Sequence, residues 1–206
     1  MAPDLILERT HLGAVAGIDE AGRGPWAGPV VAAAVILDSD SPGALPAGID
    51  DSKALSAKCR AALFDAVMAT ARVGVANAGV GEIDRLNILG ATMLAMARAV
   101  AALGDPPAHV LVDGNRLPDL PCPGTVVVGG DRRSLSIAAA SIIAKVTRDR
   151  MMASLAADFP GYGWESNVGY GTVQHRDGIA QFGVTPHHRR SFAPIRRILE
   201  LRDQYI

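Results

Sequence analysis

The hydrophobic pattern at the start of the chain predicts two neighbouring strands joined by a glycine-rich segment. Residues 14–18 (AVAGI) and 28–37 (GPVVAAAVIL) are short apolar runs with several β-branched side chains. The segment between them, DEAGRGPWAG, contains glycine and proline at a density typical of a turn. We therefore expect the chain to open with a hairpin-like pair of strands.

After this pair, the pattern alternates between helical and strand-like spacing. Cys59, Leu63 and Val67 recur at helical spacing behind Ser56, which is a good helix N-cap. One longer helix has an apolar face made of Leu86, Leu89, Met93, Met96 and Val100. The expected elements are a helix over 56–71, a strand over 72–80, a helix over 83–103, strands over 109–112 and 125–128, a helix from Ser134 or Ser136 to about 157, a helix near 172–182 and a last helix beginning at Pro194.

This order of elements favours a three-layer α/β fold with a mixed sheet, because strands and helices alternate after an antiparallel start. A chain of 206 residues can bury one substantial core. We therefore expect a single domain over residues 1–206, in which 159–206 forms a C-terminal extension of loops and helices. Residues 42–48 are expected to form a loop.

Composition limits the class of protein without identifying it. Hydrophobic residues make up 49% of the chain, charged residues 20% and aromatic residues 4%, which is typical of a globular protein with a small-aliphatic core. No apolar run approaches the roughly 20 residues of a membrane span, and the N-terminus shows no basic segment followed by an apolar stretch and a cleavage site. We expect a cytoplasmic protein with no membrane partner. Cys59 and Cys122 lack partners at zinc-ligand spacing, and we interpret them as reduced bystanders.

The charge is small overall but uneven along the chain. The formal net charge is −1, which by itself argues weakly against a nucleic-acid binder. Between Thr172 and Arg202, however, the chain has six arginines and only two acidic residues, Asp177 and Glu200. This density is compatible both with phosphate contacts and with an ordinary solvated helix face.

Acidic residues follow three of the apolar runs. Asp19 and Glu20 end the first run, Asp113 ends the fourth strand, and Asp131 follows the fifth. Ligands of open α/β sheets bind beyond the carboxyl ends of the strands. Carboxylates gathered there would repel one another and raise their pKa values unless a divalent cation neutralised them. Oxygen ligands without cysteine or histidine indicate Mg²⁺ or Mn²⁺.

A structural interpretation of these acids competes with the metal site. An aspartate after a strand is often only a turn former or a helix cap, and for Asp113 alone this is as good an explanation. Asp19 and Glu20 can face one site only if the strand bends, because neighbours on a regular strand point oppositely. The four acids together favour a metal site. His187 and His188 are adjacent, a spacing that rarely serves one cation, and we interpret them as structural or phosphate-facing.

Six sequence blocks in the same order resemble the ribonuclease HII family. They are AGIDEAGRGPWAGPVVAAAVIL at 16–37, DSKALS at 51–56, LVDGNR at 111–116, GDRRSLSIAAASIIAKVTRDR at 130–150, GYGT at 169–172 and TPHHRRSFAPI at 185–195. The resemblance covers nearly the whole chain. It implies a ribonuclease H-like three-layer fold with added C-terminal helices. It also implies a monomer whose substrates are RNA/DNA hybrids and duplex DNA with embedded ribonucleotides.

The resemblance also assigns roles to single positions. Asp19, Glu20, Asp113 and Asp131 match the four metal-binding acids. The remaining matches are to substrate-binding positions: Gly22, Arg23 and Gly24 at the RNA–DNA junction, Tyr170 stacked on the following deoxyribose, and Lys53, Ser141 and Lys145 near the nucleic-acid backbone. The implied reaction is two-metal hydrolysis on the 5′ side of a ribonucleotide, giving 5′-phosphate and 3′-hydroxyl ends. Its expected roles are removal of misincorporated ribonucleotides and of RNA primers.

The residues themselves are compatible with this assignment, with three departures. Gly22 and Gly24 lack side chains, so the backbone there could approach a sugar closely. A dinucleotide-binding loop is excluded, because the glycine spacing is wrong and a strand rather than a helix follows. Tyr170 could also be an ordinary core aromatic. The family usually has lysine where this chain has Val168 and Gly129, and often serine where it has Arg132; these departures leave the phosphate contacts open.

Three other functions compete with ribonuclease HII. Ribonuclease HIII shares the acids but normally carries a further N-terminal domain, for which we expect no room before the strand at Ala14. A relative of the same fold that resolves junctions or integrates DNA is compatible with the acids alone. A non-enzymatic nucleic-acid-binding protein would bind duplexes and release no product with Mg²⁺ or Mn²⁺.

Overall fold

A mixed five-stranded sheet forms the centre of the molecule in the computed structural model, which describes residues 2–38 and 45–203. The strands are β1 (Val15–Ala21), β2 (Val30–Ile36), β3 (Arg72–Ala78), β4 (His109–Asp113) and β5 (Gly124–Val127). Their order across the sheet is β3-β2-β1-β4-β5. β1 pairs antiparallel with β2 and parallel with β4, so the expected hairpin-like start and mixed sheet are both confirmed. The expected loop at 42–48 lies partly outside the described residues.

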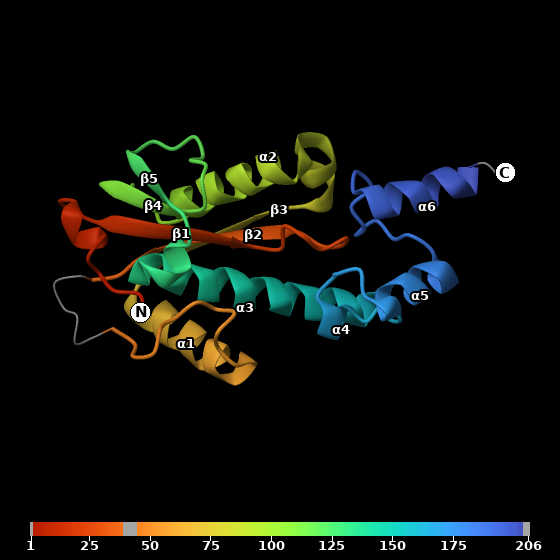
Figure 1. The fold of residues 1–206 in the computed structure, drawn as a ribbon, viewed down its shortest axis with the longest axis horizontal. Coiled ribbons are helices and arrows are strands. Elements are labelled where there is room, and N and C mark those ends of the chain that lie inside the picture. Colours follow the sequence, from red (N-terminus) through yellow and green to blue (C-terminus); the bar gives the residue numbers. More distant parts are fainter. Residues whose placement is uncertain (1, 39–44, 204–206) are drawn as a thin grey trace.

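Helices cover both faces of this sheet and extend beyond one end of it (Figure 1). The helices are α1 (Ala57–Thr70), α2 (Val80–Ala101), α3 (Leu135–Asp158), α4 (Trp164–Asn167), α5 (Val173–Phe182) and α6 (Ala193–Asp203), with short 3-10 helices η1 (Glu8–Thr10) and η3 (Gly130–Arg132). α2 lies on one face, and α3 with α1 lies on the other. The expected N-caps are confirmed, since the side chains of Ser56 and Ser134 accept hydrogen bonds from Cys59 and Ile137.

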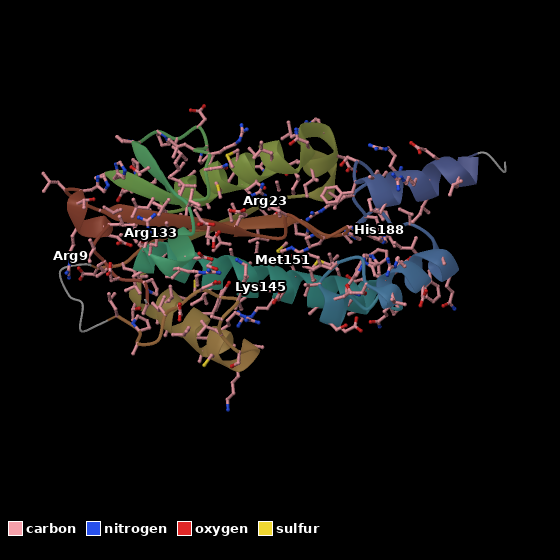
Figure 2. All side chains as sticks on the ribbon, viewed as in Figure 1. Arg9, Arg23, Arg133, Lys145, Met151 and His188 are labelled. Carbon is pink, nitrogen blue, oxygen red and sulfur yellow. The ribbon has the colours of Figure 1, made fainter. Side chains whose placement is uncertain are left out.

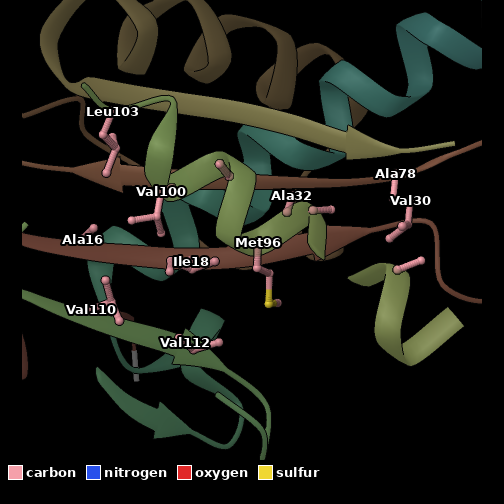
Figure 3. Close-up of a cluster of buried hydrophobic side chains, with 14 of the residues drawn as sticks. Ala16, Ile18, Val30, Ala32, Ala78, Met96, Val100, Leu103, Val110 and Val112 are labelled. Carbon is pink, nitrogen blue, oxygen red and sulfur yellow. The ribbon is translucent and has the colours of Figure 1, made fainter. Parts of the chain in front are cut away.

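Alternation along β2 divides the core into two layers. Ala32 and Ala34 belong to the apolar cluster under α2, whereas Ala33 and Val35 belong to the cluster under α1 and α3. Successive residues of a strand point to opposite faces, so an uninterrupted apolar run such as VVAAAVI is typical of a strand buried on both faces. Figure 3 shows the first cluster, in which Met96 and other side chains of α2 pack onto β1, β2 and β4.

A kink in α2 changes the apolar face expected for this helix. Asn87 has φ 59°, and its side chain accepts from the backbone N–H of Leu89 over 2.9 Å, so it ends one helical segment and caps the next. Met96 and Val100 are buried as expected, but Leu86 and Leu89 beside the kink are only half-buried. No helix in the described ranges is long and apolar enough to cross a bilayer.

The C-terminal segment packs on the far end of α3 through an apolar cluster of its own. Met152 of α3, Trp164, Ile179 and Ile195 are buried together there. The helices near 172–182 and after 193 occur where they were expected, with Thr172 as the N-cap of α5. The short helix α4 was missed, because this stretch was expected to be loop. The cluster connects the C-terminal helices to the helix that also covers the sheet.

Candidate active site

The register of two parallel strands brings Asp19 and Asp113 to the same level of the sheet. Ile18 of β1 lies opposite Val112 of β4, and the two aspartates are the next residues along each strand. Residues at matching positions of a parallel pair point to the same face. Asp113 is the last residue of β4, and Asp19 is only 5% exposed. Two of the four predicted acids are therefore neighbours at the carboxyl end of the strands.

Glu20 lies next to this pair, although β1 remains paired with β2 as far as Ala21. Its side chain is 12% exposed, and its Oε1 lies 3.2 Å from Nη1 of Arg23. Electrostatic interactions connect Glu20 with both Asp19 and Asp113. The third acid therefore interacts with the first two without an interruption of the β1–β2 ladder.

A short 3-10 turn holds the fourth acid. Asp131 lies in η3 after β5 and is 6% exposed. The backbone N–H of Gly130 donates to Oδ1 of Asp113 over 2.7 Å, which ties this turn to the end of β4. A Cβ at Gly130 would lie 2.6 Å from Cδ1 of Ile137, so the turn packs closely on α3. These contacts place Asp131 beside Asp113.

Burial and repulsion raise the pKa of three of the acids. The pKa of Asp19 is raised well above its usual value, first by burial and then by the charges of Glu20, Asp113 and Asp131. Burial also raises the pKa of Glu20 against the effect of a nearby arginine. The pKa of Asp131 is raised by burial and by two neighbouring aspartates. The acids thus form one electrostatic group that a cation would stabilise.

A fifth acid, Asp51, belongs to the same group and was missed in the sequence. It is 5% exposed, and its Oδ1 accepts from the backbone N–H of Lys53 over 2.9 Å. Nζ of Lys53 lies 3.6 Å from Oδ2 of Asp131. Burial alone would lower the pKa of Lys53, but the charges of Asp51 and Asp131 outweigh it and raise this pKa. The DSKALS turn therefore contributes both an acid and a cation to the group.

The chemistry of these acids fits a divalent cation, although their side chains would have to move to hold one. Carboxylate oxygens are the usual ligands of Mg²⁺ and Mn²⁺. Within residues 2–38 and 45–203, no three Asp, Glu, His or Cys side chains are gathered closely enough to hold a metal ion as they stand. Glu20 and Asp131 lie instead beside the cationic side chains of Arg23 and Lys53. These two cations partly neutralise the charge of the acids.

A hollow of about 390 Å³ lies beside the acids. Among the predicted site residues, its walls contain Glu20, Gly22, Arg23, Gly24, Lys53, Ser141, Lys145 and Tyr170. Asp19, Asp113 and Asp131 do not line it. Figure 2 places Arg23 on the sheet side and Lys145 on α3. The structure therefore brings all the predicted substrate-binding residues to one hollow, with Glu20 and Lys53 at its border with the acids.

The side chains that line the hollow differ in their exposure and in their hydrogen bonds. Ser141 is 4% exposed, and its hydroxyl lies 2.6 Å from that of Ser52, so it ties the DSKALS turn to α3. Nζ of Lys145 donates to Asp149 over 2.7 Å. Tyr170 is 49% exposed, which excludes the alternative of an ordinary core aromatic.

Both glycines of the GRG segment lie close to the side chains of other residues. Gly22 has φ +98°, and a Cβ there would lie 2.0 Å from Nε of Arg148. A Cβ at Gly24 would lie 3.2 Å from Cε1 of Tyr170. We expected these glycines to leave room for a sugar. The structure adds that at Gly22 a buried arginine side chain fills the space, and at Gly24 the tyrosine ring lies against the backbone.

Two arginines behind this segment are buried, which the sequence did not indicate. Arg148 is 2% exposed and Arg189 is 0% exposed. Arg189 was grouped with the basic residues that could contact phosphates, and for this residue that interpretation is wrong because it is inside the protein. Charged residues are rarely buried, so nothing in a local pattern would have distinguished these two from exposed arginines.

The three departures from the family pattern have different local roles. Gly129 has φ 64°, a left-handed conformation that glycine adopts without strain, and it precedes η3. Nε of Arg132 lies 3.4 Å from Oδ2 of Asp51. Val168 has φ 44°, which is strained for a β-branched residue, and its carbonyl accepts from Nη1 of Arg148 over 2.9 Å.

Buried histidines support the loop that carries Tyr170. Nδ1 of His188 lies 2.9 Å from the backbone N of Thr185, and its Nε2 lies 3.0 Å from Nε2 of His175. Nδ1 of His175 lies 2.9 Å from the carbonyl oxygen of Tyr170. His188 is therefore structural, as one of the two expectations held, and Figure 2 shows it near the C-terminal helices. His175 was not singled out in the sequence.

Comparisons with known proteins agree with one another. The family model described as Ribonuclease HII matches residues 16–195. Ribonuclease HII of Rhodospirillum rubrum is 60% identical over 200 residues, which cover 96% of this chain and 92% of that protein. Ribonuclease HII of Paramagnetospirillum magneticum is 61% identical over 194 residues, which cover 94% and 96% respectively.

Solved structures share the fold. Ribonuclease H2 from Pyrococcus horikoshii superposes with a TM-score of 0.72 at 28% identity, covering 91% of this chain and 98% of that one. The PCNA:RNase HII complex from Archaeoglobus fulgidus gives 0.71 at 28% identity, covering 85% and 93%. The expected ribonuclease H-like fold is thus confirmed. The chain belongs to the ribonuclease HII family and is a ribonuclease H, an endonuclease for the RNA strand of RNA/DNA hybrids.

Proposed function

We propose that this ribonuclease cuts on the 5′ side of ribonucleotides, including a single ribonucleotide in duplex DNA, and leaves 5′-phosphate and 3′-hydroxyl ends. The observation that carries the proposal is the position of the interacting acids next to a hollow lined by the GRG segment and Tyr170. A nucleic-acid strand across this border would present a phosphate to the acids and the adjoining sugars to Gly22 and Gly24.

The acids Asp19, Glu20, Asp113 and Asp131 are proposed to hold Mg²⁺ or Mn²⁺. When bound, two such cations would activate a water for in-line attack and stabilise the leaving 3′-oxygen. Asp19 would be the central residue of this ligand set, because its charge interacts with those of the other three acids. The pairing of β1 with β4 and the hydrogen bond from Gly130 to Asp113 would hold the backbone around these acids together while their side chains turn toward a cation.

The cations beside the acids suggest how substrate and metal sites are coupled. Lys53 and Arg23 each lie within 4.0 Å of a carboxylate oxygen and have side chains that are 77% and 53% exposed. A divalent ion among the acids would compete with both for the carboxylates. We propose that the displaced Lys53 and Arg23, together with Lys145 across the hollow, then contact the phosphates of the bound strand.

Recognition of the ribonucleotide is proposed to depend on the GRG backbone and on Tyr170. A 2′-hydroxyl both donates and accepts hydrogen bonds, and it is what distinguishes RNA from DNA. The half-exposed ring of Tyr170 lies against Gly24, where it could stack on the following deoxyribose. Tyr170 belongs to the segment 159–206, which we propose is a substrate-binding extension of a single domain. This selectivity would suit removal of misincorporated ribonucleotides and of RNA primers.

A cleavage assay with matched variants tests the proposal. Labelled duplexes containing one ribonucleotide, a long RNA strand or only DNA are incubated with Mg²⁺, Mn²⁺ or EDTA, and the product ends are identified on sequencing gels. We expect cation-dependent cutting 5′ of the single ribonucleotide and no cutting of DNA. Asp19→Asn should abolish cutting, whereas Asp105→Asn, at an aspartate whose side chain is 96% exposed, should not. Full activity of Asp19→Asn would contradict the assignment of the acids.

A further inference from the structure

Two charged side chains lie inside the protein directly behind the GRG segment. Arg189 and Arg148 are 0% and 2% exposed. In the part of the chain that the structure describes, neither guanidinium forms an ion pair with a carboxylate, and all the hydrogen bonds of both go to backbone carbonyls. Burying a charge without a counter-ion is costly. An apolar side chain could fill the same space at a lower cost in free energy. The hydrogen bonds of the two arginines must therefore serve some purpose other than filling space.

Arg189 binds the segment between β1 and β2 with every nitrogen of its guanidinium. Nη2 donates to the carbonyl of Gly22 over 2.6 Å, and Nη1 donates to that of Arg23 over 3.0 Å. Nε donates to the carbonyl of Gly28 over 2.9 Å, and Nη2 also reaches that of Pro29 over 3.2 Å. One planar group therefore fixes the orientation of several peptide units. Lysine, with a single nitrogen, cannot reproduce this pattern.

Arg148 holds the same segment from α3 and connects it to the loop before Tyr170. Its Nε donates to the carbonyl of Pro29 over 2.9 Å, and Nη2 donates to that of Ala27 over 3.1 Å. Nη1 donates to the carbonyl of Val168 over 2.9 Å. One side chain thus ties the segment between β1 and β2, which contains GRG, to the loop that precedes Tyr170.

The carbonyls that Arg189 binds determine where the neighbouring amides point. In a planar trans peptide, the C=O and the following N–H point in opposite directions. Because the carbonyls of Gly22 and Arg23 point toward Arg189, the N–H groups of Arg23 and Gly24 point away from it. Gly22, Arg23 and Gly24 line the hollow and Arg189 does not. In the described residues, neither of these N–H groups donates to a protein acceptor. They are free to donate to a sugar hydroxyl or phosphate.

We infer that Arg189 is a positioning residue for ribonucleotide recognition, which aims the N–H groups of Arg23 and Gly24 at the bound sugar–phosphate, and that Arg148 keeps Tyr170 in register with them. The inference rests on the proposed function and adds residues that determine its specificity. Burial lowers the pKa of Arg189 to about 9, so the side chain stays charged and a strong donor at neutral pH. Cζ of Arg189 lies 5.0 Å from the centre of the Phe192 ring, and this stacking fixes the plane of the guanidinium.

The test compares Arg189→Lys with Arg190→Lys, the same change at the exposed neighbouring arginine. Binding to a duplex with one ribonucleotide and to the identical all-DNA duplex is measured by fluorescence anisotropy, with Ca²⁺ in place of Mg²⁺. We expect Arg189→Lys to reduce the preference for the ribonucleotide on the order of tenfold. In cleavage assays of the single ribonucleotide, kcat should fall about a hundredfold, because small errors in position are costly in catalysis. Arg190→Lys should keep the wild-type preference.

The outcomes separate this inference from the proposed function. A wild-type protein without preference for the ribonucleotide would refute the proposed function itself. A folded Arg189→Lys protein with the wild-type preference, or with equal losses on both duplexes, would refute the positioning role alone. If Arg189→Lys does not fold, Arg148→Lys gives the second measurement, with the same reduced preference expected. Loss of the folded state in both variants would overturn the inference, since the arginines would then serve folding only.

Discussion

Mild acid should destabilise the protein through His188, because this buried histidine is bonded as a neutral ring. Its Nδ1 accepts from the backbone N–H of Thr185, so the proton is on Nε2 and is donated to Nε2 of His175. That nitrogen of His175 also accepts from Nε1 of Trp164 over 3.0 Å. A further proton on His188 would point at the N–H of Thr185, and a further proton on His175 would point at two donors. Protonation therefore breaks the hydrogen-bonded chain that ends at the carbonyl of Tyr170.

The size of this effect follows from the pKa of His188. Burial, with the neighbouring charges of His175 and His187, lowers this pKa from its usual 6.5 to about 4. The unfolded chain takes up the proton near pH 6.5 and the folded protein only near pH 4, so stability is complete above 6.5 and is lost as the pH falls between these values. At about 1.4 kcal/mol per pKa unit, the total is about 3 kcal/mol, of which about 2 kcal/mol is lost by pH 5.

Urea unfolding followed by tryptophan fluorescence measures this loss at pH 7.5 and pH 5. Buried acids such as Asp19, whose pKa values are raised, change stability in the opposite direction over part of this range. The comparison is therefore with His188→Asn, whose amide oxygen can still accept from Thr185 and does not titrate. We expect this variant to be less stable at pH 7.5 and to lose about 2 kcal/mol less on acidification. An equal pH dependence in the two proteins would refute the reasoning.

Four further results are expected. Tyr170→Ala should weaken cutting at a single ribonucleotide with little change in melting temperature, since the ring is 49% exposed; unchanged cutting would remove its role. Gly22→Ala should lower the free energy of unfolding by more than about 2 kcal/mol, because the positive φ strains alanine and its Cβ would clash with Arg148. Gly104→Ala has a similar positive φ but open space around the Cβ, so it should lose less; chemical denaturation measures both. Glu8→Ala should lower the free energy of unfolding by about 2 kcal/mol, since Glu8 accepts three hydrogen bonds at the start of α3; an unchanged value in chemical denaturation would contradict this. Asp19→Asn should raise the melting temperature of the metal-free protein, because a buried, repelled carboxylate becomes neutral; a lower value would contradict the repulsion.

The strands and most helices could be predicted because their signals are local. The run VVAAAVI is apolar at every position, which indicates a strand buried on both faces, and the structure pairs it between β1 and β3. Ser56 and Ser134 cap helices because their side chains bond to backbone only three residues away. Local signals were misleading at a helix kink and insufficient for a very short helix. The kink at Asn87 changed the buried face of α2, and the short helix α4 has too few residues for a periodic pattern.

The acids were identifiable because each stands at the end of an apolar run, but their grouping depends on the register between strands. The sequence indicates that Asp113 ends a strand; only the pairing of β4 with β1 places it level with Asp19. Asp51 had no such signal, because it lies in a turn that reaches Asp131 only through the packing of DSKALS on α3.

The sequence by itself determined the family and most of the order of elements, and it pointed to four acids as candidate ligands, since motifs and hydrophobic periodicity depend on neighbouring residues. The tertiary structure decided which charged residues are inside. Arginine is usually a surface residue. Arg148 and Arg189 can be buried because backbone carbonyls from segments more than a hundred residues away accept their hydrogen bonds. Long-range hydrogen bonds have no period in the chain, so the residues that orient the GRG segment become visible only when the fold brings donor and acceptor together.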